Sequence, residues 1–405
     1  MVCHDLPSPS NPLTFRVFNA VKYLSKKYNH NITLVAFKEM RYESRYTHDL
    51  EKYCDVEVEE IPNMDSFKMR LMYAIKNMLS FQNIFSKNPS FFNFYYSPKM
   101  QRKIRKLLKT KKFDIIFVDL YTMIPYVLDV DIPKIIEVWA EGDAYYREYK
   151  SKYWIDLQHP LSTFFSKIYL WFQYYKIINY EKKYEKFDRC VTATDHEKNK
   201  LKSYLPNLNI SVIPYGADLD YFKPMNIEQD FPSLIFVGNM STQVNKSAII
   251  YFYTEIYPLI KDEIPNIKLY IVGKDPSEEI LKLTSYDVIV TGYVEDVRPY
   301  MARASVVILP IIKSVGIKTR VFDVMAMGKP LVSTSIGARG INVLPEENII
   351  IADDPKEFAR LVIELLNNDH LRQMISSNAR KFIESNYSWE KMTDMLNKIF
   401  QNVSC

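Results

Sequence analysis

Several features are scarce or missing in this chain of 405 residues, and each one excludes a class of protein. No stretch reaches the ~18 uncharged apolar residues that a membrane-spanning helix needs, and no basic-then-apolar signal opens the chain. The four cysteines lie far apart without CxxC or Cys/His spacing, which excludes a disulfide framework and a zinc site. We therefore expect a cytoplasmic protein, at most peripheral on the cytoplasmic face of a membrane, that binds no metal.

Glycine is also scarce, and its placement is informative. Of the nine glycines, eight lie between Gly216 and Gly340. Several directly follow apolar runs, as in FVG ending at Gly238, IVG at Gly273 and VTG at Gly292. Glycine is thus concentrated where strands end, which is the edge at which open α/β sheets bind their ligands.

Short apolar runs alternate with amphipathic segments along the chain, which predicts two α/β units with parallel, doubly wound sheets. The first run is short, since only Val2 and Cys3 precede polar residues. The other expected strands are 31–37, 55–61, 113–119, 133–139, 189–194, 233–238, 267–273, 287–292, 305–310, 330–334 and 348–351. Two prolines among polar residues at 222–232 mark a boundary between a domain at 1–222 and a domain at 223–386.

The most informative stretch is 310–340, which follows the buried strand expected at 305–310. Gly316 allows close approach of a ligand, and a helix expected to begin near Ile317 would carry Lys318, Thr319 and Arg320 in its first turn. Such a turn can hold phosphate, and Asp323 one turn on can accept two ribose hydroxyls. The alternative is an ordinary strand-helix-strand crossover whose cation happens to lie there.

The N-terminal half carries an uneven charge. Between Met64 and Lys112 there are twelve Lys and Arg residues against Asp65 alone, so this segment has a net charge of +11 in a chain whose total is +5. A helix at 98–112 would turn Ile104, Leu107 and Leu108 inward and its cations outward. With interleaved aromatic residues, the segment suits an anionic membrane surface. No nucleic-acid motif accompanies the charge, and a solvated basic helix is the alternative.

Three places in the N-terminal half could face an acceptor. Arg16 lies in the first turn of a helix expected at 14–28, facing a loop at 8–12 that contains Asn11. Glu141 and Asp143 follow the strand at 133–139. A solvated arginine and ordinary loop solvation are the respective alternatives.

Two further patterns predict local structure. Asp129-Val130-Asp131 matches a metal-binding DxD pattern but precedes Pro133, so we interpret it as a turn. Asp195 is expected to cap a helix that follows the strand at 189–194.

These motifs carry a family resemblance. The order YGADLDYF, FVG, IVGKDP, TGYVEDVRPYMARASVVILP and GIKTRVFDVMAMGKPLVST resembles the retaining glycosyltransferases of family 4 (glycosyl transferases group 1), most closely the exopolysaccharide-associated sugar transferase subgroup. The match is specific over 213–341 and weaker before it. The resemblance implies the GT-B fold, in which two Rossmann-like domains face each other across a cleft. The last helix, within 387–405, would cross back to the first domain.

The resemblance also implies roles for residues. The nucleotide base would rest near Gly292 and Val294, the diphosphate on the Gly316 turn and Arg320, and the ribose on Asp323. The donor-binding set is Gly238, Asn239, Lys246, Lys274, Gly292, Val294, Gly316, Thr319 and Asp323; the catalytic set is Arg320, Lys318 and Asp143; the acceptor-side set is Arg16, Asn11 and Glu141.

The chain departs from the family pattern in four places. Val315 replaces the first acid of the Glu-x7-Glu pattern, and Asn239 replaces an arginine. Lys246 only loosely replaces a lysine, and Tyr215-Gly216 stands for an Asn-Gly turn.

The expected function is a hexosyltransferase of polysaccharide biosynthesis. It would move a sugar from a nucleoside-diphosphate sugar to a glycan or lipid-linked acceptor with retention, and without metal, other cofactor or nucleic acid. One alternative is a nucleotide-sugar epimerase on the same fold, which would need histidines and carboxylates in the cleft; the available ones are His4, His196, Glu141 and Asp143. The other is an inactive nucleotide-sugar-binding partner protein, for which Val315 and Asn239 are the arguments.

Overall fold

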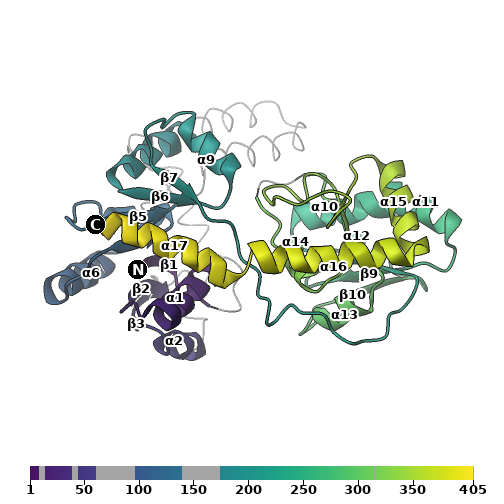
Figure 1. Ribbon diagram of the computed structural model, residues 1–405, viewed down its shortest axis with the longest axis horizontal. Coiled ribbons are helices and arrows are strands. Elements are labelled where there is room, and N and C mark those ends of the chain that lie inside the picture. The colour runs from purple at the N-terminus through teal and green to yellow at the C-terminus, as the bar shows by residue number, and fades with distance from the viewer. Residues whose placement is uncertain (9–13, 39–43, 61–95, 139–173, 314–315, 405) are drawn as a thin grey trace. The chain divides into compact units, whose positions relative to one another are not determined.

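The protein consists of two compact units, each built on a parallel sheet (Figure 1). The computed structural model describes residues 1–8, 14–38, 44–60, 96–138, 174–313 and 316–404. One unit comprises Met1–Pro214 and Met392–Cys405, and the other comprises Tyr215–Lys391. Each has its own hydrophobic core. The predicted α/β class with two Rossmann-like units is confirmed.

The N-terminal unit has a seven-stranded sheet in the order β3-β2-β1-β4-β5-β6-β7, with every neighbouring pair parallel. Its strands are β1 Val2–Asp5, β2 Thr33–Lys38, β3 Asp55–Glu60, β4 Ile116–Asp119, β5 Lys134–Glu137, β6 Arg189–Thr192 and β7 Ile210–Val212. The sequence predicts a polar boundary after Cys3, but β1 continues through His4 and Asp5. Packing explains the difference, because His4 is buried and its Nδ1 lies 3.1 Å from the Thr122 hydroxyl.

Helices connect these strands and pack against the sheet. Their bounds are α1 Phe15–Tyr28, α2 Ser44–Glu51, α6 Pro98–Thr110, the 3-10 helices Tyr121–Tyr126 and Lys182–Lys186, and α9 Asp195–Lys202. The last helix of the chain, α17 Trp389–Ser404, packs on this unit. Its Asp394 accepts hydrogen bonds from Lys27 and Tyr28, and Phe400 contacts the ring of Phe117.

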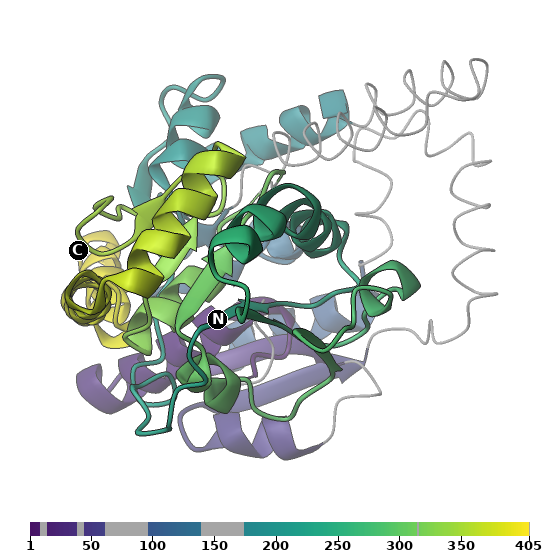
Figure 2. The same ribbon diagram turned by 90° about the vertical axis from the view of Figure 1, so that its right-hand side faces the viewer.

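The C-terminal unit has a six-stranded parallel sheet in the order β10-β9-β8-β11-β12-β13. Its strands are β8 Ser233–Val237, β9 Lys268–Val272, β10 Val288–Gly292, β11 Val306–Leu309, β12 Leu331–Ser333 and β13 Ile350–Ile351. From β8 the strands continue through β9 and β10 to one edge of the sheet, and from β11 they continue through β12 and β13 to the other edge. With right-handed crossovers, this order places helices on both faces of the sheet (Figure 2).

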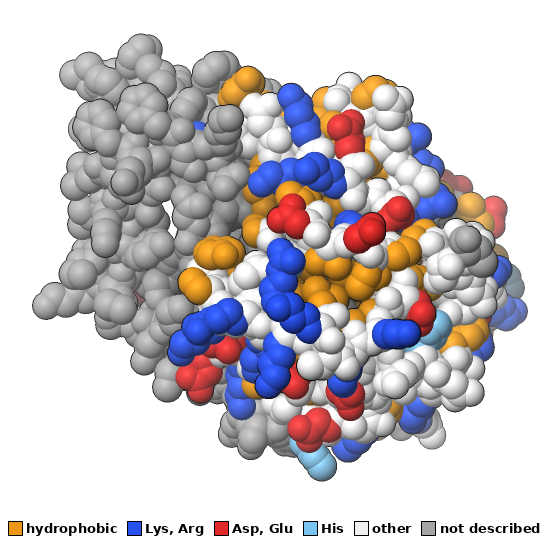
Figure 3. All heavy atoms as spheres, turned by 90° about the vertical axis from the view of Figure 1, so that its left-hand side faces the viewer, with side chains coloured by type: hydrophobic (Ala, Val, Ile, Leu, Met, Phe, Trp, Pro, Cys, Tyr) orange, Lys and Arg blue, Asp and Glu red, His pale blue; other side chains and the backbone are white. Residues whose placement is uncertain are grey.

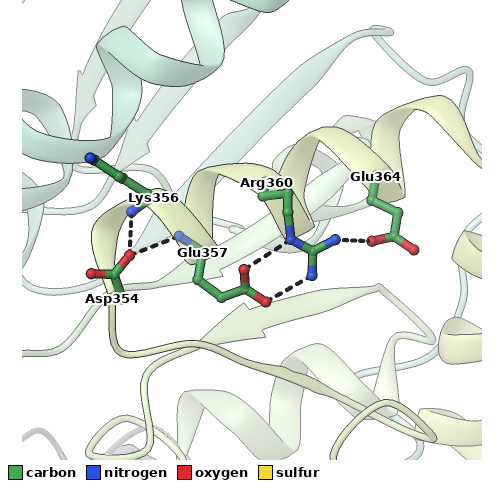
Figure 4. Close-up of polar contacts among 5 residues, drawn as sticks. All are labelled: Asp354, Lys356, Glu357, Arg360 and Glu364. Carbon is green, nitrogen blue, oxygen red and sulfur yellow. Dashed lines mark hydrogen bonds and ion pairs between the residues drawn. The ribbon is translucent and has the colours of Figure 1, made fainter.

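The helices of this unit begin and end at recognisable signals. They are α10 Gln243–Tyr251, a π-helical turn Phe252–Ile256, α11 Tyr257–Glu263, α12 Glu278–Leu281, α13 Arg298–Arg303, α14 Arg320–Ala326, α15 Pro355–Asn367 and α16 Asp369–Asn386. In α15, the Asp354 carboxylate accepts from the backbone N–H groups of Lys356 and Glu357 (Figure 4). Arg360 then pairs with Glu357 and Glu364 on the exposed face.

Two helix starts differ from the prediction. Regular helix α14 begins at Arg320 rather than near Ile317, since Lys318 and Thr319 form a tight turn in which Lys318 O accepts from Val321 N at 3.0 Å. The cap of α9 is Thr194 rather than Asp195. Thr194 and Glu197 form a reciprocal capping box, a T-x-x-E signal that is present in the sequence.

The chain enters and leaves the C-terminal unit at adjacent places. Ala217 donates its N–H to the Tyr387 carbonyl and forms a parallel bridge with Ser388. Gly216 lies directly against Trp389, where a Cβ atom would come within 2.5 Å of Cδ2 of the indole. Only glycine fits this close contact. We refer to Gly216, Ala217, Tyr387, Ser388 and Trp389 as the clasp.

Candidate donor site

The C-terminal sheet has a topological switch point between β8 and β11, which are neighbours in the sheet but not in sequence. Leu234 and Ile235 of β8 pair with Val306 and Val307 of β11. From here the chain continues to opposite sides of the sheet, so the loops after β8 and β11 diverge. Ligands of doubly wound sheets bind at the carboxyl ends of such strands. The loops at 238–242 and 310–319 are therefore the first place to look for a site.

Three of the predicted glycines meet at this edge. Gly238 donates its N–H to Val272 O at 3.0 Å, and Gly273 donates to Gly292 O at 3.2 Å. Gly273 has φ +148°, and a Cβ atom there would come within 1.7 Å of the Gly238 carbonyl oxygen. Glycine is thus required for the loops to approach each other. Lys274 follows with an exposed side chain, and its carbonyl accepts from Met240 N at 2.9 Å.

The loop after β8 is held by its own side chains. The Asn239 amide oxygen accepts from Ser241 N at 3.1 Å and from its hydroxyl at 2.8 Å. Asn245 donates to Asn239 O at 2.9 Å, and Thr242 caps α10. Lys246 pairs with Glu279 at 2.6 Å, so its charge is already matched. Asn239 and Lys246 therefore stabilise this loop as the structure stands.

The loop after β11 is anchored to the loop after β12. Thr334 donates its hydroxyl to Ile311 O at 2.6 Å and accepts from Gly337 N at 3.1 Å. Ser333 donates to Leu309 O at 3.2 Å. These bonds fix the backbone at Leu309 and Ile311. Gly316, Lys318 and Thr319 follow a few residues later in the chain. Gly316 and Thr319 are exposed, and Val315 lies outside the described residues.

Arg320 and Asp323 form a pair at the start of α14. Arg320 Nη1 lies 3.0 Å from Asp323 Oδ2. Burial raises the pKa of the Asp323 carboxyl to about 6, although Arg320 opposes the rise and Asp218 adds to it. Arginine has five N–H donors, so this single bond leaves the guanidinium able to hold an anion. The second carboxylate oxygen of Asp323 can likewise accept hydroxyls.

Lys318 is a half-buried cation that has neither an ion pair nor a side-chain hydrogen bond among the residues that the structure describes. Burial lowers the pKa of its ammonium group, because water is removed and no counter-charge replaces it. An anion bound next to Lys318 would supply that charge. This is the opposite of Lys246, whose partner is already in place.

The predicted base site has an open turn. Gly292 has φ +68°, and a Cβ atom added there would meet no described atom within 4 Å, while Val294 is half-buried against the core. Tyr293 between them is 75% exposed.

The sequence did not single out Asp218. Its carboxylate accepts hydrogen bonds from Asp220 N and Tyr221 N, and its charge contributes to the rise in the pKa of Asp323.

The acceptor-side residues that are described lie in a different environment. Arg16 is 9% exposed; its Nε lies 2.7 Å from Glu137 Oε1, and its Nη1 donates to Ile213 O at 2.8 Å. Glu137 ends β5, and burial raises its pKa while Arg16 opposes that rise. Burial also raises the pKa of Asp119, at the end of β4, well above its ordinary value. Asn11, Glu141 and Asp143 lie outside the described residues.

The sequence contained a signal for this group that was missed. Asp119 ends the apolar run 115–118 and Glu137 lies within the apolar run 135–140, so each carboxylate must be buried with its strand. Within the described ranges, no three His, Cys, Asp or Glu side chains are grouped so as to hold a metal ion. Nor is any helix in those ranges both long and apolar enough to cross a bilayer.

Comparison with known proteins finds a family match in the C-terminal unit. Residues 231–368 match the family model described as glycosyl transferases group 1. A 44.6 kDa protein of the cps region of Klebsiella pneumoniae is 26% identical over 73% of this chain and 76% of its own length. The glycosyltransferase MJ1178 of Methanocaldococcus jannaschii is 26% identical over 54% of this chain and 60% of its own length. The matched region thus spans less than two thirds of that second relative.

Solved structures share the fold along the whole chain. A sucrose-phosphate synthase from Thermosynechococcus elongatus covers 99% of this chain with a TM-score of 0.67 at 14% identity, and this chain covers 98% of it. HepE from Anabaena, in complex with UDP and glucose, covers 99% with a TM-score of 0.62 at 12% identity, and 98% of it is covered. These likenesses show the GT-B fold. Residues 231–368 are thus similar to a group 1 glycosyltransferase domain, the chain shares the GT-B fold, and the comparisons give no support to an epimerase.

Proposed function

We propose that this protein transfers a hexosyl group from a nucleoside-diphosphate sugar to a glycan or lipid-linked acceptor, with retention of the anomeric configuration. The observation that carries the proposal is the half-buried Lys318, without a partner among the described residues, two positions before the Arg320–Asp323 pair. A diphosphate next to a ribose supplies an anion for the cations and hydroxyls for the carboxylate. Polysaccharide biosynthesis is the supported setting, because one relative belongs to a cps region and another is named as a capsular polysaccharide glycosyltransferase.

In this proposal the cations act on the leaving group. Negative charge grows on the diphosphate oxygen as the bond to the sugar breaks, and Lys318 and Arg320 stabilise that charge without a metal ion. Asp323 holds the ribose hydroxyls and keeps Arg320 oriented through their ion pair. Gly238, Gly273 and Gly292 keep the edge of the sheet free of side chains where the nucleotide approaches.

The nucleotide is the part of the proposal that a simple experiment tests. HepE structures contain UDP and UDP-glucose, so UDP is the first ligand to try, followed by GDP. We expect UDP or GDP to raise the melting temperature in the presence of EDTA, because a ligand that binds only the folded state stabilises it. A shift that required Mg²⁺ or Mn²⁺ would contradict the metal-independent site. Release of free sugar from the donor would then separate an enzyme from an inactive binding protein.

We further propose that α6 places the enzyme on the cytoplasmic face of an anionic membrane. Five of its cations, Lys99, Arg102, Arg105, Lys106 and Lys109, are exposed. Figure 3, viewed from the side on which α6 lies in Figure 1, shows Lys and Arg side chains gathered in groups with fewer acidic ones between them. Ile104 is buried, and Leu107 and Leu108 are half-buried against the core, so the expected inward stripe forms. One expectation is corrected: Lys103 is not a free outward cation, because it donates to Val58 O at 2.6 Å and contacts Glu57.

A further inference from the structure

The C-terminal unit has a cavity at the edge of its sheet opposite the glycine loops. It has a volume of about 420 Å³ and is lined by residues just before the first residues of β8, β9 and β10. Ligands of doubly wound sheets bind at the carboxyl ends of strands, so this cavity at the amino ends is separate from the candidate donor site. Its size falls within the range of roughly 300–1,000 Å³ that holds small ligands.

Two aromatic rings at the cavity are turned to solvent. Tyr286 is 97% exposed and Phe231 is 53% exposed. Tyr286 lies in the turn between α12 and β10, and Phe231 immediately precedes β8. Covering this aromatic surface with an apolar face of a ligand would be favourable. The Tyr286 ring is available to an apolar surface of a ligand, whereas the Arg372 guanidinium lies 5.0 Å from the centre of the Phe231 ring.

The charged groups of the cavity are already paired. Asp230 accepts from Lys268 at 2.9 Å and from the Tyr270 hydroxyl, and the hydrogen bond from Tyr270 lowers the pKa of the Asp230 carboxyl. Asp287 pairs with Lys261 and accepts from Ser285 at 2.7 Å. Two lysines thus face two aspartates, and the lining carries no net charge. A phosphate or another strong anion would find no surplus cation here.

The polar rim can still make hydrogen bonds. The exposed amide of Asn266 has no partner among the described residues, and the bound carboxylates of Asp230 and Asp287 retain acceptor capacity. Ion pairs hold both carboxylates in place, so little side-chain freedom is lost when a ligand binds. The lining therefore combines aromatic faces, fixed acceptors and a neutral charge.

We infer that this cavity is a second carbohydrate site that binds a neutral oligosaccharide, with a sugar ring stacked on Tyr286. Hexose rings have an apolar C–H face that stacks on an aromatic ring and a rim of hydroxyls that bonds to carboxylates and amides. The inference deepens the proposed function, on which it rests: the cavity holds a distant segment of the growing glycan acceptor while its end reacts elsewhere. Binding of a saccharide to this cavity is measurable without any transfer reaction.

The experiment is saturation-transfer NMR and calorimetry on the full chain with maltohexaose, cellohexaose and mannohexaose, at concentrations up to the millimolar range. At least one should bind, and Tyr286→Ala should weaken that binding about tenfold, the effect of losing one stacked ring. Tyr286→Phe should restore it, because the ring remains. Since Tyr286 is almost fully exposed, its replacement should leave the melting temperature unchanged.

Two matched variants keep this test separate from that of the donor site. Tyr293→Ala removes another exposed tyrosine from the opposite edge of the sheet and should leave saccharide binding intact. Arg320→Ala should weaken UDP binding but not saccharide binding, while Tyr286→Ala should do the reverse. If none of the three hexasaccharides binds, or if Tyr286→Ala binds as tightly as the wild type, the second site is wrong. If the saccharides bind but UDP and GDP do not, the proposed donor site fails instead.

Discussion

The two sheets have the same parallel topology but treat the charges at their carboxyl edges in opposite ways. In the N-terminal unit, the edge beside β1 and β4 holds buried charges that satisfy one another, with Arg16 bonded to Glu137 and to backbone carbonyls. In the C-terminal unit, the edge is lined by glycine turns, and Lys318 has no partner among the described residues. A charge that is already paired holds the fold, whereas a charge left without a partner can bind a ligand. The comparison predicts different consequences for the arginines of the two edges.

The largest effect is expected at Arg16. Arg16→Ala should lower the free energy of unfolding by about 3–5 kcal/mol, because it leaves the Glu137 carboxylate buried without its counter-charge. Urea unfolding followed by circular dichroism measures this. Arg16→Ala together with Glu137→Leu should recover part of the loss, since both charges are then gone. Near-native stability of the single variant would instead favour the acceptor-side role predicted for Arg16.

Exposed cations of α6 have no ion-pair partner among the described residues, and their reversal comes next. Lys106→Glu, Lys109→Glu and Arg105→Glu together should remove roughly 3 kcal/mol of binding to vesicles of acidic lipid, at about 1 kcal/mol per cation near the surface. Co-sedimentation at low salt is the measurement, with neutral vesicles as control. Lys103 is left unchanged because it is bonded to β3. Unaltered sedimentation of the triple variant would show that this face is only solvated.

At the C-terminal edge, Arg320→Ala should weaken binding of UDP by about 1.5–3 kcal/mol, the value of a hydrogen bond to a charged group. Binding of uridine should hardly change, and calorimetry with both ligands gives the difference. Arg360→Ala is the matched control, since Arg360 is an arginine of the same unit whose charge is taken up by Glu357 and Glu364 (Figure 4). Equal losses for UDP and uridine would remove Arg320 from the phosphate site.

The smallest effect concerns Asp323 and pH. Burial raises the pKa of its carboxyl group to about 6, so the carboxylate that we propose accepts ribose hydroxyls is lost as pH falls below that value. Binding of UDP-glucose should weaken by about 1 kcal/mol between pH 7 and pH 5, and Asp323→Asn should abolish this dependence. The diphosphate of UDP-glucose does not titrate in that range.

The same shift in pKa acts on stability with the opposite sign. The folded state holds the Asp323 proton more tightly than the unfolded state, whose pKa is 3.8, so the contribution of Asp323 to stability falls as pH rises from about 4 to 6. Asp323→Asn should remove this contribution, and unfolding curves at the two pH values measure it.

Local signals in the sequence predicted the fold well. Every expected strand forms, because each one is a short apolar run or, at 55–61, a short alternating one, bounded by polar residues, glycine or proline. The glycine loops at Gly238, Gly273 and Gly292 meet as the edge rule predicts. Helix starts were less accurate. The tight turn before α14 depends on hydrogen bonds to the carbonyl groups of Lys318 and Thr319, which hydrophobic periodicity does not reveal. The Thr194 cap, in contrast, belongs to a T-x-x-E motif that is visible in the sequence.

The candidate site was harder to predict, because a charge's role depends on partners that lie far away in the sequence. Arg16 stands in the first turn of a helix, and nothing near it indicates that Glu137 and Ile213 will enclose its guanidinium. Lys246 similarly meets Glu279 only after α10 and α12 pack together. Lys318 and Arg320 could be singled out because their chemistry depends on adjacent residues after a buried strand. Short-range patterns therefore indicate the candidate donor site, while long-range pairing shows which of the nearby cations already have partners.

The clasp has a consequence for how this protein can be divided. Because Gly216 and Ala217 are bonded and packed to Tyr387, Ser388 and Trp389, both ends of the C-terminal unit are fastened inside that unit. The N-terminal unit, by contrast, is made of two pieces of chain, Met1–Pro214 and Met392–Cys405. Residues 215–391 are thus inserted between the two pieces of the N-terminal unit, and the two ends of the insertion are bonded to each other. The N-terminal unit is complete only once α17 has been added. During synthesis the C-terminal unit is therefore complete before the N-terminal unit has received its last helix.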